Sequence, residues 1–382
     1  MRCAWGATAM NPNERIIGIS GGRWQMCTPS LLLDLDAFER NLVAMAAQAR
    51  KSGLALRPHA KAHKSIAVAR RQIATGAIGI SCATLGEAEV LAAAGIPGLL
   101  VTSPVVTPSM IARLVAIQGD VMVVVEDGRN VAALAQAVAS TGRRLRVLVE
   151  IDVGQHRTGV ASRQDAVTLA RAIHASVHLE FCGIQAYWGH LQQVQDFAER
   201  RRVVSQQGEI VRDAIAVLRE AELPPRIVTG GGTGTAWIDA DLGLFTELQP
   251  GSYLFMDSSY CRPTLWPDGR APFETSLFVR ANVVSVNRPE HAVINAGLKS
   301  FATDSGQPFA IRGAPSGTTY KFMGDEHGAL VYGAATDARL ALGDGVELAV
   351  SHCDPTVNLY DQLHCVRGDQ LSEIWRIDAR GR

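Results

Sequence analysis

A lysine near the N-terminus is the first residue of this 382-residue chain with a type and position suited to covalent chemistry. It lies in the segment Arg57-Pro58-His59-Ala60-Lys61-Ala62-His63-Lys64, directly after an apolar run that predicts a strand. Burial at a strand end removes water from the amine, lowers its pKa and leaves it free to attack a carbonyl carbon. The alternative is a surface lysine whose stem packs while its amine stays in water. The neighbours His59, His63 and Lys64 favour a functional role for Lys61.

A glycine-rich segment farther along the chain has the composition of an anion-binding turn. Residues 229–235 read Thr-Gly-Gly-Gly-Thr-Gly-Thr and hold four glycines and three hydroxyls. Glycines let backbone N–H groups approach an anion closely, and threonine hydroxyls add hydrogen bonds. The segment is neither a Walker A motif nor a GxGxxG motif after a first strand, so a turn without a ligand is the alternative. Gly251, Ser252 and Tyr253 would complete a cup for a phosphate group.

A third candidate is the segment His352-Cys353-Asp354 near the C-terminus. In an extended segment, His352 and Asp354 point the same way because side chains alternate along a strand, whereas Cys353 points away and packs. An imidazole and a carboxylate together suit a divalent cation such as Mn²⁺, Zn²⁺ or Mg²⁺. A hydrogen-bonded surface pair without a metal is the alternative.

Alternating strands and helices would have to position these residues. From about residue 28 to 257, apolar β-branched runs alternate with alanine-rich helical stretches, which predicts a parallel sheet covered by helices. Eight strand candidates are the number expected of a (β/α)8 TIM barrel, with a doubly wound open sheet as the competing α/β fold. The eight predicted strands are Leu54–Ala60, Ile78–Ala83, Leu99–Ser103, Val121–Glu126, Leu145–Ile151, Leu179–Tyr187, Arg226–Thr229 and Glu247–Phe255.

The pattern changes after about residue 270, where short strand-like runs are punctuated by glycine and proline. This predicts a separate β-rich domain. We therefore expect an N-terminal lead-in over residues 1–27 that is loosely ordered, a barrel over 28–265 and a β-rich domain over 266–382. Active sites of TIM barrels lie at the carboxyl ends of the strands, and polar side chains crowd the ends of these predicted strands.

Composition excludes several classes of protein. The chain has 37 basic and 37 acidic residues and is 47% hydrophobic, which argues against disorder and against nucleic-acid binding. Seven cysteines without a CxxC pair predict a reducing, cytoplasmic location. No apolar run is long enough for a membrane span, and no signal peptide is expected.

Taken together and in this order, these motifs resemble the fold-type III enzymes that use pyridoxal 5′-phosphate (PLP). The motifs are Arg57 to Lys64, Asp152-x-Gly154-x-x-Arg157-x-Gly159, Gly230 to Gly232, Gln249-Pro250-Gly251-Ser252-Tyr253, and His352-x-Asp354-Pro355-Thr356. More narrowly, they resemble the D-threonine aldolase and D-serine dehydratase group, which has an alanine-racemase-like barrel and a C-terminal β-domain. The resemblance covers residues 28 to 361.

The resemblance implies a role for each candidate residue. Lys61 would bind PLP as a Schiff base, and Arg157 would face the phenolic oxygen of the cofactor. Tyr187 would contribute to the cofactor site and, with His190, line its substrate side, where His190 would be the general base. His352 and Asp354 would bind the divalent cation, most simply Mn²⁺. The residues implied to hold the cofactor's phosphate are Thr229, Gly231, Gly232, Gly251, Ser252 and Tyr253.

Within this group, His-x-Asp resembles the aldolases and His-x-Cys the dehydratases, so Asp354 favours an aldolase. The implied reaction cleaves a D-3-hydroxy-α-amino acid to glycine and an aldehyde. The alternatives are a dehydratase on the same scaffold, a non-catalytic PLP-binding protein, and a metal-dependent barrel enzyme without PLP. The resemblance also implies a homodimer. Lys299, Asp304 and His327 would then either reach a partner's pocket or make local hydrogen bonds at turns.

Overall fold

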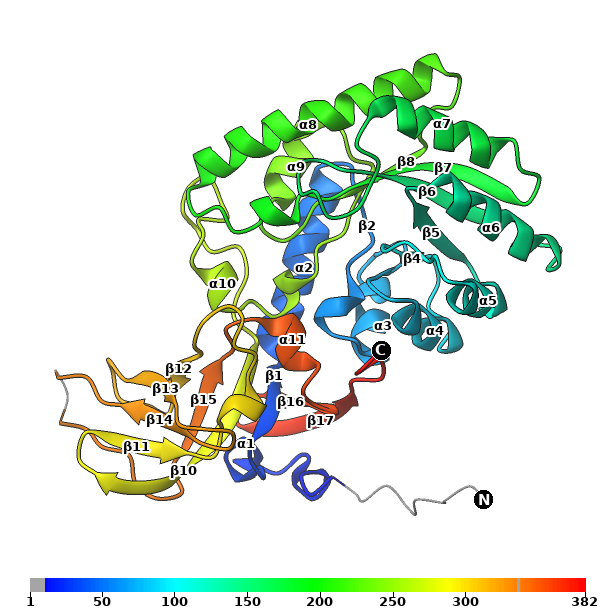
Figure 1. The fold of residues 1–382 in the computed structure, drawn as a ribbon. Coiled ribbons are helices and arrows are strands. Elements are labelled where there is room, and N and C mark those ends of the chain that lie inside the picture. Colours follow the sequence, from blue (N-terminus) through cyan, green and yellow to red (C-terminus); the bar gives the residue numbers. More distant parts are fainter. Residues whose placement is uncertain (1–10, 335–336) are drawn as a thin grey trace, which may run out of the picture.

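An eight-stranded parallel barrel forms the larger part of the molecule (Figure 1). The computed structural model describes residues 11–334 and 337–382. The strands follow the order β2-β9-β8-β7-β6-β5-β4-β3, and a parallel bridge between His59 and Ser81 joins the two ends of the sheet. The predicted α/β barrel is thus confirmed. Its strands are β2 (Ala55–Leu56), β3 (Ser81–Cys82), β4 (Leu99–Val101), β5 (Val121–Val125), β6 (Leu145–Ile151), β7 (Leu179–Ala186), β8 (Ile227–Gly230) and β9 (Glu247–Leu248).

The strands are apolar throughout because both of their faces are covered. Every residue of β5, for example, is buried. Met122 and Val124 belong to a small cluster inside the barrel, whereas Val123 and Val125 belong to the large core under the helices. This two-sided burial explains why the sequence showed continuous apolar runs and no alternation.

Helices cover the outside of the barrel (Figure 1). Most of them begin at an Asp, Ser or Thr whose side chain accepts a hydrogen bond from the first helical turn, as Asp196 does for α8. The helices are α2 (Leu35–Lys51), α3 (Ile66–Ala74), α4 (Leu85–Ala93), α5 (Pro108–Ala116), α6 (Gly128–Ala139), α7 (Arg163–His174), α8 (Phe197–Glu220) and α9 (Ala236–Leu242). No helix in the described ranges is long and apolar enough to cross a membrane.

A mixed, nine-stranded sheet forms the second domain. Two short helices, α10 (Ser258–Cys261) and α11 (Cys353–Val357), lie between this sheet and the barrel (Figure 1). The predicted β-rich domain is therefore present. Its strands are β1 (Ser30–Asp34), β10 (Leu277–Arg288), β11 (His291–Ile294), β12 (Phe309–Arg312), β13 (Thr319–Phe322), β14 (Gly328–Val331), β15 (Gly345–Ala349), β16 (Gln362–Arg367) and β17 (Gln370–Arg376).

The N-terminal part of the chain contributes to this second sheet. Although the sequence grouped residues 28–265 with the barrel, β1 pairs with β10 and β16, and its burial on all sides suits a central strand. Residues 11–27, expected to be loosely ordered, dock on the same sheet through α1 (Gly22–Gln25), where the buried Arg23 pairs with Glu347 at 2.6 Å. Residues 1–10 of the expected lead-in lie outside the described residues. The chain thus crosses from the second domain into the barrel along α2.

Candidate active site

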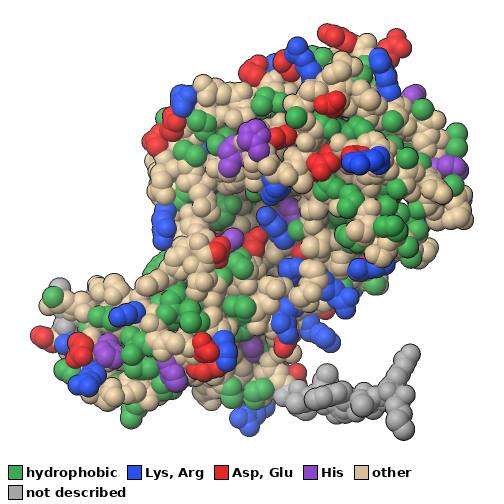
Figure 2. Space-filling model, viewed as in Figure 1, with side chains coloured by type: hydrophobic (Ala, Val, Ile, Leu, Met, Phe, Trp, Pro, Cys, Tyr) green, Lys and Arg blue, Asp and Glu red, His purple; other side chains and the backbone are tan. Residues whose placement is uncertain are grey.

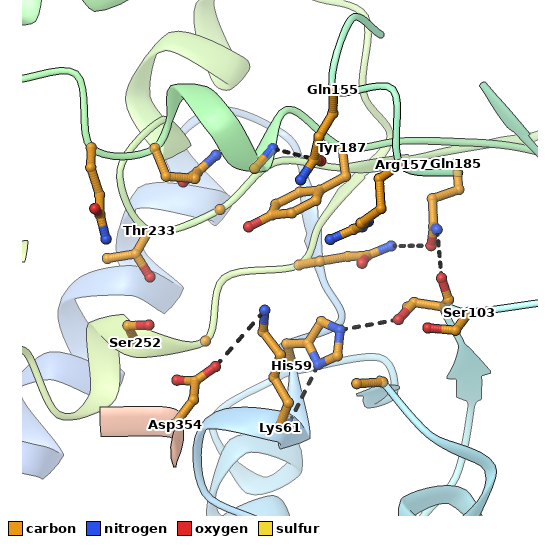
Figure 3. Close-up of a pocket in the computed structure, with 18 of the residues that line it drawn as sticks. His59, Lys61, Ser103, Gln155, Arg157, Gln185, Tyr187, Thr233, Ser252 and Asp354 are labelled. Atoms are coloured by element: carbon orange, nitrogen blue, oxygen red, sulfur yellow. Dashed lines mark hydrogen bonds and ion pairs between the residues drawn. The ribbon is translucent and has the colours of Figure 1, made fainter. Parts of the chain in front are cut away.

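A cavity of about 480 Å³ lies at the carboxyl ends of the barrel strands, where α10 and α11 of the second domain face them. Figure 2 shows Lys, Arg, His and acidic side chains gathered at this junction of barrel and sheet. Most of the residues proposed from the sequence come together in the cavity wall (Figure 3). Those that line the cavity are Lys61, Arg157, Tyr187, Gly232, Gly251, Ser252, His352 and Asp354.

Lys61 projects into the cavity from a single 3-10 turn, η2 (Ala60–Ala62), which follows β2. The ring nitrogen Nδ1 of His59 accepts a hydrogen bond from the Lys61 N–H and so caps this turn. His59 is buried, and desolvation lowers its pKa well below the usual value. Its Nε2 lies 3.1 Å from Thr102 Oγ1, which donates to the Cys82 carbonyl. A neutral imidazole with its proton on Nε2 fits these contacts and fixes the base of the lysine.

The sequence predicts a lowered pKa for Lys61, and this prediction is wrong for the chain without a cofactor. Burial does lower the pKa of the amine, but the electrostatic effects of Tyr187, Asp354 and Cys353 together raise it by more, so the net change in pKa is upward. The amine lies 3.8 Å from Asp354 Oδ2, and the lysine side chain is 41% exposed. An ammonium facing a carboxylate is therefore the favoured state before any cofactor binds.

Tyr187 and Arg157 form the opposite wall of the cavity (Figure 3). Tyr187 follows β7, and its ring centroid lies 5.9 Å from Lys61 Nζ and 5.7 Å from Arg157 Cζ. The ring thus lies close to both cations. Tyr260 of α10 also lines the cavity but was not proposed from the sequence, because a single tyrosine outside a recognised motif carries no chemical signature.

The glycine-rich segment forms one end of the cavity, although not through every residue expected. Gly232, Thr233, Gly251 and Ser252 line it, and together they present small residues and hydroxyls. This set, which we call the phosphate cup, has Thr233 in place of the expected Thr229. The Thr233 hydroxyl also accepts a hydrogen bond from the Tyr253 N–H.

The other residues expected to hold phosphate do not line the cavity. Thr229 is fully buried and accepts a hydrogen bond from Gln249 Nε2 at 2.8 Å. Gly231 faces away, toward Asp239. The Tyr253 hydroxyl accepts a hydrogen bond from Gln72 Nε2 at 3.4 Å, also away from the cavity. Adjacent residues of a turn point in different directions, which composition alone does not reveal.

The wall from the second domain carries His352 and Asp354, but in a geometry different from the one expected. His352 is the extended N-cap residue of α11, whereas Asp354 lies inside that helix, so the two do not share a strand face. Both nevertheless line the cavity, and Cys353 is fully buried as expected. The buried Asp257 accepts hydrogen bonds from the N–H groups of Cys353 and Tyr260 and so ties α11 to α10.

Asp304 adds a second carboxylate to this wall. Its Oδ2 lies 2.6 Å from His352 Nδ1, so it contacts a cavity residue of its own chain. Burial raises the pKa of Asp304, but the hydrogen bond and the charge of His352 together lower it by more. Lys299 pairs instead with Glu326 on the surface. The described residues contain no group of three or more His, Cys, Asp or Glu arranged to hold a metal by themselves.

His190, expected to be the general base, lies at the rim. It belongs to the 3-10 turn η3 (Gly189–Leu191) after β7, and its imidazole is exposed. Its neighbour Gly189 lines the cavity, but His190 is not among the lining residues of the described chain. Partial burial lowers its pKa, against an opposing effect of Asp152.

The fold class follows from the combination of a parallel barrel with a strand-rich second domain and a lysine in the cavity between them. Residues 33–259 match the family described as "Alanine racemase, N-terminal domain", and residues 276–366 match a "Putative serine dehydratase domain". The chain therefore belongs to the alanine racemase-like, fold-type III group of PLP enzymes, which includes the D-threonine aldolases.

Individual relatives agree with this assignment. The chain is 43% identical to a D-threonine aldolase of Arthrobacter sp., with 93% of each chain covered. It is 37% identical to a 3-hydroxy-D-aspartate aldolase of Paracoccus denitrificans (strain Pd 1222), over 93% of this chain and 92% of the relative. The crystal structure of D-threonine aldolase from Filomicrobium marinum superposes with a TM-score of 0.89 at 40% identity, covering 94% of this chain and 96% of that one.

The cavity fits both groups that the family implies. A lysine amine in the wall and the phosphate cup at one end match the aldehyde and the phosphate of PLP. An imidazole and a carboxylate match a cation of borderline to hard character. Two side chains would leave the remaining positions of such a cation open to water or substrate, as in catalytic rather than structural metal sites.

Proposed function

We propose that this protein is a PLP- and divalent-metal-dependent aldolase that cleaves D-3-hydroxy-α-amino acids to glycine and an aldehyde. The observation that carries the proposal is the 3.8 Å separation of Lys61 Nζ and Asp354 Oδ2 across one cavity. A covalent cofactor on the first residue and a metal on the second would therefore act on the same substrate. The 43% identity to a D-threonine aldolase supports this proposal.

Each side chain would have a role that follows from its position in the cavity. Lys61 would hold the cofactor covalently, with Arg157 and Tyr187 beside it and the phosphate cup at the far end. PLP supplies an electron sink for the pair released when the Cα–Cβ bond breaks, and the metal lowers the pKa of the substrate hydroxyl. His352 and Asp354 would hold the metal, with Mn²⁺ as the first choice. His190 would accept the hydroxyl proton, since imidazole works near neutral pH.

Product analysis tests the proposal directly. Protein loaded with PLP and Mn²⁺ is incubated with D-threonine, L-threonine and D-serine, and aldehyde, glycine, keto acid and ammonia are assayed. The proposal expects acetaldehyde and glycine from D-threonine alone. 2-Oxobutanoate and ammonia would identify a dehydratase, and a bound cofactor without product would identify a PLP-binding protein. Activity in protein that lacks the absorbance of bound PLP would indicate a metal-only enzyme.

We further propose that the protein is a cytoplasmic homodimer, as the family resemblance implies. Light scattering at micromolar concentration tests the oligomeric state and would contradict the proposal by giving the 40.9 kDa of a single chain.

A further inference from the structure

A buried carboxylate with no assigned role lies behind the phosphate cup. Asp239, on α9, is fully buried and does not line the cavity. Its Oδ1 accepts a hydrogen bond from Trp188 Nε1 at 3.0 Å, and its Oδ2 accepts one from the Thr235 hydroxyl at 2.6 Å. The backbone N–H of Gly232 also faces it and lowers its pKa. Asp239 therefore lies directly behind the backbone of the glycine-rich turn that forms part of the cup.

These contacts join two loops that form different parts of the cavity. Trp188 follows Tyr187 after β7, whereas Gly232 and Thr235 belong to the loop after β8. Gln192 makes a second connection, since its side chain accepts from the Gly234 N–H at 2.9 Å and donates to Thr235 Oγ1 at 3.0 Å. The loop after β7, which carries Tyr187 and Trp188 and which we call the substrate-side loop, is thus connected to the phosphate cup on the side away from the cavity.

The shape of the turn depends on the carboxylate. Gly231 has φ +69°, and a Cβ added there would lie 2.5 Å from Asp239 Oδ2. A side chain on Gly232 would likewise collide with Gln192. The glycines of this turn therefore serve its packing against Asp239 and Gln192, in addition to leaving room for an anion.

No cation within the described residues balances this carboxylate. The helix α9 packs against α8 (Figure 1), but the basic residues there have other partners. Arg201 pairs with Asp241 on the surface, and Arg200 bonds to the carbonyls of Val194 and Thr264. Trp188, which donates to Asp239, packs edge to face on Phe245 and brings no charge to the carboxylate. Burial without a counter-charge raises the pKa of Asp239 to about 7, against the effect of its hydrogen-bond donors.

We propose that Asp239 is a positioning residue that joins the phosphate cup to the substrate-side loop and makes cofactor affinity depend on its own protonation. A phosphate dianion in the cup would add negative charge next to this group, and like charges disfavour ionisation. Phosphate binding is then accompanied by proton uptake on Asp239 above neutral pH. This inference rests on the proposed function, because it requires that PLP occupy the cavity.

The sign of the pH dependence follows from linkage. If the pKa of Asp239 is higher in the PLP-bound protein than in the free protein, the affinity for PLP is highest below the pKa of Asp239 in the free protein. The affinity then falls as pH rises through that pKa. A tenfold change in affinity requires that the pKa of Asp239 differ by about one between the free and the bound protein. Since the phosphate of PLP is itself a dianion above about pH 7, a fall in affinity between about pH 7 and 8.5 does not arise from ionisation of that phosphate.

The test compares PLP with pyridoxal, which lacks the phosphate. Affinities of both for the cofactor-free protein are measured by absorbance and fluorescence titration across the same pH range. Both ligands react with Lys61, so the ratio of their affinities isolates the phosphate contribution. In wild type we expect this ratio to fall by roughly three- to tenfold over the range. In Asp239→Asn we expect a flat ratio, with pyridoxal affinity unchanged.

Two further variants complete the design. Asp241→Asn, on the exposed face of the same helix, should keep the wild-type slope. Thr235→Val removes one donor from the carboxylate and should move the fall in affinity to higher pH, which tests the inference even if Asp239→Asn does not fold. An Asp239→Asn protein with the wild-type slope, or with equal losses for both ligands, would overturn the inference. Wild-type protein that binds neither ligand would instead overturn the proposed function.

Discussion

The two walls of the cavity are built differently. On the barrel side, the groups behind the cavity surface are buried and hydrogen-bonded, as in His59 with Thr102 and Thr235 with Asp239. Lys61 and Arg157 are the more exposed exceptions on this side. On the side of the second domain, the groups are titratable and partly exposed. Asp304 is 53% exposed and His352 29% exposed, and they pair with each other. The barrel wall is therefore organised before ligands bind, whereas the second wall holds charges that must exchange partners.

This difference indicates which interactions change when the site is loaded. Covalent attachment of Lys61 to the cofactor would remove its ammonium from Asp354, leaving that carboxylate to a cation. Cofactor loading would therefore change the partner of a group on the second wall, whereas the buried hydrogen bonds of the barrel wall would stay as they are. Four substitutions test this contrast, beginning with the residue that stands between the walls.

Lys61→Ala should have the largest effect. Removing the amine that would bind the cofactor should lower turnover by on the order of 10⁴-fold or more and abolish the long-wavelength absorbance of covalently bound PLP. Lys64→Arg is the control, because Lys64 pairs with Glu87 at 2.6 Å outside the cavity and Arg keeps that charge. A Lys61→Ala protein that keeps the absorbance band would assign the cofactor to another lysine.

The barrel wall was also the more predictable of the two. Continuous apolar runs and intervening helices located all eight barrel strands, and strand-end position then located Lys61, Tyr187 and Gly232. Gln185 and Gln249 also line the cavity at strand ends, but an amide at such a position carries no chemical signature in a sequence. The orientation of individual turn residues, as for Thr229 against Thr233, depends on backbone angles that the composition does not specify.

The second wall was harder to predict because it is built from contacts between residues that are far apart in the sequence. Asp304 reaches His352 across 48 positions, and β1 pairs Leu33 with Leu277. No local pattern encodes such pairs. The His-x-Asp motif did identify two cavity residues, but a short helix replaced the extended geometry first expected because Asp354 lies in the first turn of α11. The motif was informative through its family resemblance and not through its spacing.

Asp354→Asn tests the second wall. A metal contributes several kcal/mol of charge stabilisation, so its loss should lower turnover by roughly 10³-fold, and bound Mn²⁺ measured by elemental analysis should fall with it. The absorbance of bound PLP should persist, since the barrel wall is intact. Asp361→Asn, which alters an exposed pair with Arg380, is the control. Full activity of wild type after chelation would contradict a catalytic metal.

His190→Ala tests the rim between the walls. General bases contribute about 10²–10⁴-fold, and the exposed position of this imidazole leads us to expect the lower end, about 10²-fold in turnover with little change in KM. His156→Ala, a neighbouring rim histidine paired with Asp152, should have almost no effect. Equal effects of the two substitutions would indicate that a residue inside the cavity, and not His190, accepts the proton.

Asp304→Asn should have the smallest effect and separates the walls most clearly. A carboxylate on one imidazole nitrogen fixes the tautomer and leaves the other nitrogen for a metal, and loss of such a partner costs about 10- to 100-fold in metal affinity. We therefore expect weaker Mn²⁺ binding by calorimetry, activity restored by excess Mn²⁺, and unchanged PLP affinity. Ser305→Ala, which removes only a hydroxyl that donates to Asp304, should change Mn²⁺ affinity far less. If Asp304→Asn weakened PLP and Mn²⁺ equally, the two walls would not be independent, and the contrast between a preorganised barrel side and a charge-exchanging second domain would be wrong.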